Sequence, residues 1–138
     1  MARVVVIGAT GHIGSYLVPR LVRADYEVVA VSRGDRQPYH DAAEWRSVRR
    51  VRADREAEEA AGGFGRRIAD LQPDAVVDLI CFTPVSAQHL VEALRPASPL
   101  LLHCGTIWVH GRAARVPVAE DERRTGFAQR GVDHRERA

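Results

Sequence analysis

The chain has 138 residues, of which 46% are hydrophobic and 28% charged. This composition suits one globular domain and excludes a disordered or collagen-like protein. All 20 residues of the Lys+Arg total are arginines, and the sequence contains neither lysine nor asparagine. A Schiff-base lysine and the lysine of a P-loop are therefore excluded within these residues. The formal net charge of +2 is too small for a strongly basic nucleic-acid-binding surface.

Cysteine content and hydropathy indicate the compartment. Two cysteines do not make a disulfide framework, which favours a reducing environment. The first apolar run, at residues 4–7, is too short for a signal peptide and is followed by glycines. No segment approaches the roughly 20 apolar residues of a membrane span. We therefore expect a cytoplasmic protein that binds neither a membrane nor nucleic acid.

Apolar runs recur along the first hundred residues. Runs without polar alternation are typical of parallel strands that are buried on both faces. They lie at residues 4–7, 28–31, 75–80 and 100–104. Residues 45–51 form a weaker candidate, because arginines interleave with valines as on the edge of a sheet.

Helical spacing separates these runs. Ile13, Leu17 and Leu21 recur every fourth residue, and Pro19 predicts a local kink in that helix. Residues 64–71 and 87–94 show the same spacing, and residues 52–59 indicate a solvated helix start.

Strands that alternate with helices predict an α/β fold with a parallel sheet and helices on both faces. We expect a Rossmann-type, doubly wound sheet of five strands in the order 3-2-1-4-5, truncated before a substrate-binding part. The expected division is a dinucleotide-binding domain over residues 1–123 and an irregular tail over residues 124–138.

A glycine-rich loop follows the first predicted strand and opens the first predicted helix. Gly8 permits a tight turn, Gly11 a close approach of backbone to a pyrophosphate, and Gly14 close packing of helix on strand. The phosphates would lie at the helix N-terminus, where amide groups and the helix dipole favour an anion. The expected cofactor-binding residues of this loop are Gly8, Thr10, Gly11, His12, Ile13 and Gly14. The alternative is a glycine-rich turn without a ligand.

The end of the second predicted strand bears on the choice of cofactor. An acidic residue there would bind the adenosine ribose of NAD, whereas this chain has Ser32 and Arg33. A guanidinium suits a 2′-phosphate or stacks on adenine, and the Ser32 hydroxyl is a further donor to that phosphate. NADP is therefore favoured over NAD, although Asp35 is close enough to restore an acidic contact. The alternative for Arg33 is an ordinary exposed loop residue.

The Gly-x-x-Gly-x-x-Gly loop and the segment at residues 105–111 resemble the NAD-dependent epimerase/dehydratase family of extended short-chain dehydrogenase/reductases. The resemblance covers residues 3–122. It implies hydride transfer between a nicotinamide and a small-molecule substrate, and it places Thr106 at the catalytic Ser/Thr position. It also implies that Asp54, and more weakly Arg55, contacts adenine. The backbone of Leu79, Ile80 and Cys81 would border the nicotinamide side.

The family's Tyr-x-x-x-Lys pair is absent, since the last tyrosine is Tyr39 and there is no lysine. We therefore expect a dinucleotide-binding domain that has no turnover as this chain alone. Two alternatives are a non-catalytic dinucleotide-binding or redox-sensing module and a non-functional truncated or frame-shifted remnant. An open sheet edge beyond the last strand would favour self-association.

No metal site is expected, because His103, Cys104 and His110 lack a recognisable zinc spacing. Cys81 and Cys104 lie at strand ends, either as small buried apolar residues or as a redox pair or metal site.

Overall fold

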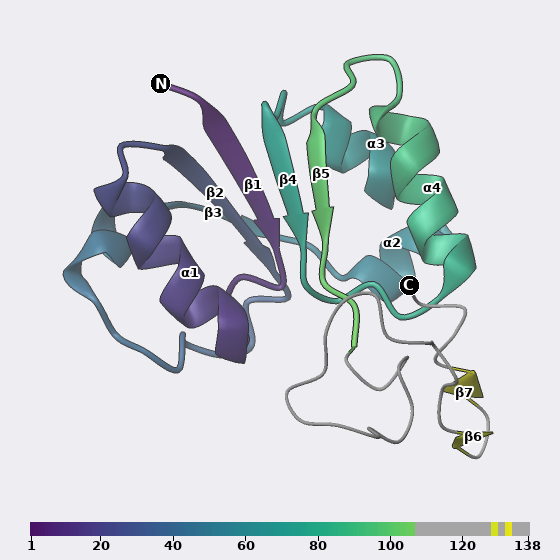
Figure 1. Cartoon of the computed structure of the whole chain (residues 1–138), viewed down its shortest axis with the longest axis horizontal. Helices are drawn as coiled ribbons and strands as arrows, with labels where there is room; N and C mark the ends of the chain where they lie inside the picture. The colour runs from purple at the N-terminus through teal and green to yellow at the C-terminus, as the bar shows by residue number, and fades with distance from the viewer. Residues whose placement is uncertain (107–127, 130–131, 134–138) are drawn as a thin grey trace, which may run out of the picture.

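The computed structural model of the chain describes residues 1–106, 128–129 and 132–133. A five-stranded parallel sheet has the order β3-β2-β1-β4-β5 (Figure 1). The predicted strand order is therefore confirmed. The strands of this sheet are β1 (Arg3–Ile7), β2 (Glu27–Ser32), β3 (Arg49–Arg52), β4 (Ala75–Asp78) and β5 (Leu100–His103). The helices are α1 (His12–Arg23), the 3-10 helix η1 (Ala43–Ser47), α2 (Arg55–Ala60), α3 (Phe64–Ala69) and α4 (Pro84–Leu94).

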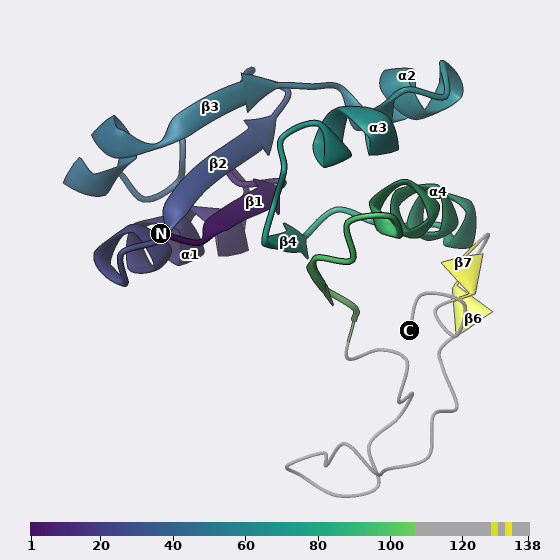
Figure 2. The same ribbon diagram turned by 90° about the horizontal axis from the view of Figure 1, so that it is seen from above.

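The helices cover both faces of the sheet, with α1 on one face and α2, α3 and α4 on the other (Figure 2). Alternate residues of β1 accordingly enter two separate cores. Val5 and Ile7 pack with Phe64, Ile68 and Leu90 on the side of α3 and α4. On the opposite side, Val4 and Val6 pack with Val18, Val28 and Trp45. Burial on both faces explains why the central strands lack polar alternation.

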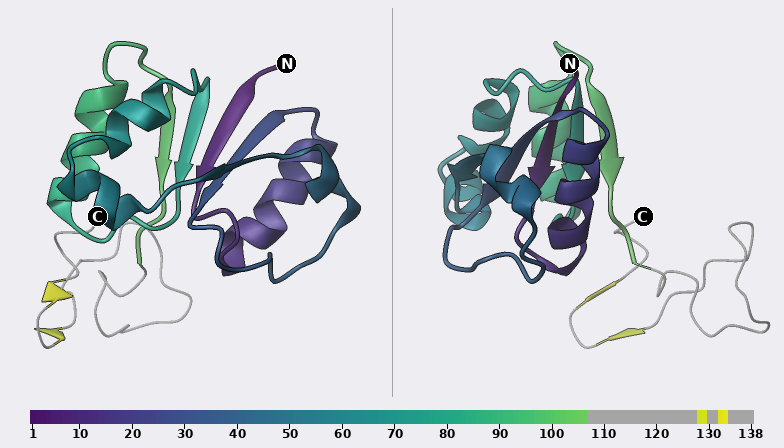
Figure 3. Two further views of the ribbon diagram at one scale, coloured as in Figure 1. Left: turned by 180° about the vertical axis from the view of Figure 1, so that it is seen from behind. Right: turned by 90° about the vertical axis from the view of Figure 1, so that its left-hand side faces the viewer.

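All five strands run in one direction, so their carboxyl ends meet at a single edge of the sheet (Figure 3). The central strand β1 pairs with β2 on one side and with β4 on the other. The crossover from β1 to β2 passes through α1 on one face, and the crossover from β3 to β4 passes through α2 and α3 on the other. A crevice is expected outside the carboxyl ends where the connections diverge in this way.

The expected strand at 45–51 is wrong in its first half. Residues 43–47 form η1, and β3 begins only at Arg49. Trp45 is buried beneath α1 in the core with Val18, which removes it from the sheet edge. The first two residues of β3, Arg49 and Arg50, are exposed, as expected of an edge strand.

The predicted apolar face of α1 is confirmed at Leu17 and Leu21, which pack partly buried against the core, and is wrong at Ile13. Ile13 is exposed, and the buried residues are Gly14, Ser15, Val18 and Pro19. The helix lies close to the loop before it because Gly14 has no side chain. The helix continues through Pro19.

Outside the sheet, β6 (Ala128–Gln129) pairs antiparallel with β7 (Val132–Asp133). The proposed domain boundary at residue 123 lies outside the described residues and stays a prediction. None of the described helices combines the length and the hydrophobicity that a bilayer crossing requires.

Candidate functional site

A cavity of about 590 Å³ lies at the carboxyl edge of the sheet. Its walls come from the segments that directly follow β1, β2, β3 and β4. The structure places nine of the fourteen predicted site residues around it: Gly8, Thr10, Gly11, His12, Ser32, Arg33, Asp54, Arg55 and Ile80. Residues separated by up to 72 positions in the sequence thus share one cavity.

The glycine loop forms one wall, and its geometry explains two of its glycines. Gly8 has a φ of +83°, a conformation that side chains disfavour. The amides of Gly8 and Ala9 both donate to the carbonyl of Val31, which ties the loop to β2. A Cβ on Gly14 would lie 2.3 Å from the carbonyl oxygen of Ala9, so only glycine permits this approach of α1. The N-terminus of α1 follows Gly11, which offers no side chain to cap it.

Ser15 fastens a second loop to the glycine loop. Its hydroxyl is buried, donates to the Gly11 carbonyl at 2.7 Å and accepts from the Tyr39 amide at 2.9 Å. The Tyr16 and His40 rings stack with centroids 4.9 Å apart. These contacts hold the segment after β2 beside the cavity, where Arg36 and Tyr39 join its lining.

Cationic groups gather where β2 ends. Ser32, Arg33 and Arg36 line the cavity there. Asp35 is absent from the lining and pairs instead with the guanidinium groups of Arg33 at 3.8 Å and Arg52 at 3.9 Å. In the sequence, Asp35 was a possible acidic contact to the cofactor. In the structure its carboxylate is paired with two arginines instead.

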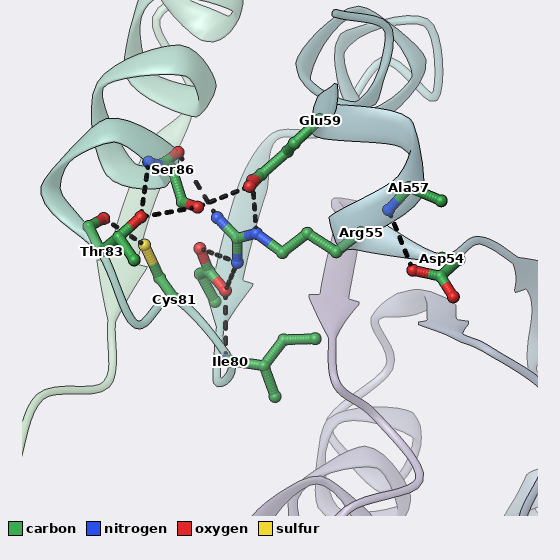
Figure 4. A network of polar contacts seen from close by, with 9 residues as sticks. Asp54, Arg55, Ala57, Glu59, Ile80, Cys81, Thr83 and Ser86 are labelled. Atoms are coloured by element: carbon green, nitrogen blue, oxygen red, sulfur yellow. Dashed lines mark hydrogen bonds and ion pairs between the residues drawn. The ribbon is translucent and has the colours of Figure 1, made fainter. Parts of the chain in front are cut away.

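The two neighbouring candidates after β3 differ in their contacts. Asp54 lines the cavity and caps α2, accepting from the Ala57 amide at 3.2 Å. Arg55 extends the other way, toward the start of α4 (Figure 4). Its guanidinium donates to both carboxylate oxygens of Asp78, at 2.8 and 2.9 Å, and to Glu59 at 2.6 Å.

Arg55 is therefore the centre of a buried ion-pair network. The side chains of Arg55 and Asp78 are 8% and 2% exposed. Burial lowers the pKa of Arg55, but the charge of Asp78 and the hydrogen bonds to Glu59 and Asp78 outweigh it and leave the pKa above its ordinary value. The network reaches α4 through the Ser86 hydroxyl, which donates to Glu59 at 2.5 Å. The guanidinium, expected as a weak adenine contact, thus joins α2, β4 and α4.

Five predicted site residues do not line the cavity: Ile13, Gly14, Leu79, Cys81 and Thr106. Thr106 follows β5, and residues 107–111 of the family-like segment lie outside the described residues. Leu79 packs against the core that contains Val4 and Val6. Cys81 is buried, which raises the pKa of its thiol, and it is a free cysteine like Cys104.

Seven lining residues were not expected: Arg36, Tyr39, Glu56, Glu59, Phe82, Thr83 and Ser86. A local signal existed for Thr83, because a threonine before a proline is typical of a helix start. Thr83 indeed caps α4, accepting from the Ser86 amide at 3.1 Å. The spacing of Arg55 and Glu59, four residues apart, was a second such signal.

A curated protein is similar to this chain in sequence. The chain is 30% identical over 131 residues to a 2'-dehydrokanamycin reductase from Streptomyces kanamyceticus. The alignment covers 95% of this chain and 35% of the relative. The chain thus spans about a third of the relative's length.

Solved structures show the same fold. A putative epimerase from Burkholderia cenocepacia superposes with a TM-score of 0.71 at 24% identity, covering 92% of this chain and 45% of that one. The Bordetella bronchiseptica enzyme WbmH in complex with NAD+ gives a TM-score of 0.63 at 23% identity, covering 90% and 45%.

The model of one family matches residues 4–131, which span the sheet domain from the second residue of β1 onward. The matched region contains the glycine loop, the cavity and the confirmed strand order. The chain belongs to the NAD dependent epimerase/dehydratase family.

Proposed function

We propose that the chain binds a nicotinamide dinucleotide in the cavity at the carboxyl edge of the sheet. The observation that carries this proposal is the glycine loop, which forms the cavity wall at the N-terminus of α1. Backbone amides at such a terminus attract a pyrophosphate. The adenosine end would lie between the end of β2 and Asp54, which line the same cavity. The WbmH complex with NAD+ supports the assignment through a shared fold.

NADP is the proposed preference over NAD. Arg33 and Arg36 line the cavity beside Ser32, which is the side where the adenosine ribose would lie. The nearest carboxylate in the sequence, Asp35, does not line the cavity and is paired with Arg33 and Arg52. An arginine beside the ribose favours the additional 2′-phosphate of NADP.

The family's hydride transfer depends on a tyrosine and a lysine, and these 138 residues contain no tyrosine after Tyr39 and no lysine. Thr106 stays the proposed Ser/Thr position for orienting a substrate oxygen. We therefore propose that this chain alone binds the cofactor without turnover. A non-catalytic dinucleotide-binding or redox-sensing module would have the same property.

Isothermal titration calorimetry of the purified chain with NADPH, NADP+, NADH and NAD+ tests the binding. The wild-type chain is expected to bind the 2′-phosphorylated forms more tightly. Arg33→Ala should weaken NADP+ binding by about tenfold, the loss of one charge-assisted contact, and leave NAD+ binding nearly unchanged. Arg20→Ala is the matched control, because Arg20 is an exposed arginine near the other end of α1 and does not line the cavity.

Two outcomes would contradict the proposal in different ways. Equal effects of Arg33→Ala on NADP+ and NAD+ would refute the 2′-phosphate contact but not the cavity. Absence of binding by all four nucleotides would refute dinucleotide binding and favour a non-functional remnant. Oxidation of NADPH with a carbonyl substrate, abolished by Thr106→Ala, would show that the chain does have turnover.

A further inference from the structure

Three residues with different ligand atoms converge at the ends of β4 and β5. Asp78 and His103 are the last residues of these strands and are direct register partners. Cys81 follows β4 by three residues. A carboxylate oxygen, the Cys81 sulfur and an imidazole nitrogen all lie within 4.8 Å of one another. None of the three residues lines the cavity proposed for the nucleotide.

We propose that Asp78, Cys81 and His103 form a binding site for a divalent transition-metal ion of the zinc class. Sulfur and imidazole ligands favour zinc over magnesium or calcium, which prefer oxygen ligands. Ligands of a tetrahedral zinc ion lie about 3.5 Å apart, so the group must contract by about 1 Å. His103 is exposed, so its ring is free of the core packing that holds the other two residues. Three protein ligands leave a fourth position for water.

The carboxylate of Asp78 retains room for an ion although it is paired. A carboxylate has about four lone-pair positions. Arg55 takes one on each oxygen, and the Ile80 amide takes a second on Oδ1 at 3.3 Å. The hydrogen bonds of the described residues leave one lone-pair position on Oδ2 unused. Arg55 then has the role of an outer partner, which holds a ligating carboxylate in a fixed orientation.

The charges around the group favour a cation. Arg55 contributes one positive charge, and the carboxylates of Asp78 and Glu59, both paired with it, contribute two negative charges. The coordinated sulfur would be a thiolate, with its proton released to solvent, which adds one more negative charge. A divalent ion would neutralise the remaining charge in a buried setting, where uncompensated charge is costly.

Cobalt titration of the reduced full chain, without nucleotide, tests the site. Co²⁺ replaces Zn²⁺ in such sites and reports on them, because a thiolate ligand produces a charge-transfer band in the near ultraviolet. The wild-type chain is expected to show this band and to lose it when Zn²⁺ is added. Cys81→Ser should abolish the band, and His103→Ala should weaken the apparent affinity by about tenfold or more.

Two matched variants control for adventitious binding. Cys104→Ser removes the other described cysteine, and His89→Ala removes an exposed histidine of α4 outside the group. Both should titrate as the wild-type chain does. Since His103 is exposed, its variant is expected to keep the fold, which circular dichroism verifies. Absence of the band in the wild-type chain, its persistence in Cys81→Ser, or equal losses in His103→Ala and His89→Ala would each overturn the proposal.

Discussion

Replacing Gly14 with alanine tests the closest approach between α1 and the glycine loop. The added Cβ would lie 2.3 Å from the Ala9 carbonyl oxygen and 2.6 Å from its carbonyl carbon, whereas ordinary contact begins at 3.4 Å. The obstacle is backbone, so the helix must move by about 1 Å. Overpacking of this kind costs up to about 3 kcal/mol, and the better helix propensity of alanine returns about 1 kcal/mol. We expect a net loss of about 2 kcal/mol.

Urea denaturation followed by circular dichroism measures this loss. With a slope of about 2 kcal/mol per molar urea, the midpoint of Gly14→Ala should fall by about 1 M. Gly63→Ala is the matched control, because the nearest atom to its added Cβ is the Glu58 carbonyl oxygen at 3.9 Å. Its free energy of unfolding should stay within about 0.5 kcal/mol of the wild-type value. A Gly14→Ala midpoint at or above that of the wild-type chain would refute the steric argument.

Three further changes probe other parts of the molecule. Asp78→Ala leaves the buried guanidinium of Arg55 short of a partner and should lower the free energy of unfolding by about 3–5 kcal/mol; an unchanged urea midpoint would contradict the pairing. Iodoacetamide should modify Cys81 more slowly than Cys104 in the folded chain, because burial raises the pKa of the Cys81 thiol and less thiolate is present at a given pH. Equal rates of modification, measured by peptide mass spectrometry, would contradict this prediction. Leu102→Glu places a charge on β5, an edge strand of the described sheet, and should reduce self-association as measured by sedimentation velocity. A wild-type chain that is monomeric at every concentration would contradict this expectation.

The strand order was predictable because each strand carries its own signal. A buried parallel strand is continuously apolar, and the following helix has its own spacing, so the alternation could be followed along the chain. The handedness of crossovers then restricts the possible orders. The exception is the segment before β3, where Trp45 packs beneath α1. The packing of Trp45 depends on α1, which is distant in the sequence, so it could not be predicted from residues 45–51 alone.

The glycines of the loop could be predicted from local spacing, whereas pairings between side chains and groups far apart in the sequence could not. Gly8 and Gly14 follow from local turn and packing geometry, which the spacing of the loop expresses. In contrast, Ser15 meets the Tyr39 amide across 24 positions, and Arg55 meets Asp78 across 23. No periodicity links such pairs, because the fold alone brings them together. In the sequence, Arg55 was therefore a candidate because it lies beside Asp54, and its pairing with Asp78 was not predicted.

The cavity at the carboxyl edge of the sheet forms only when strands that are distant in the sequence pair with β1. Each pairing in the sheet joins strands that are separated by a crossover, so no wall of the cavity forms within a local hairpin. Such long-range pairings form slowly, and the cavity is complete only when β4 has joined β1. A ligand that binds only the assembled sheet adds about 2.7 kcal/mol to its stability at a hundred times the dissociation constant. Under the proposed function, the free energy of unfolding of the chain therefore rises with the concentration of free cofactor.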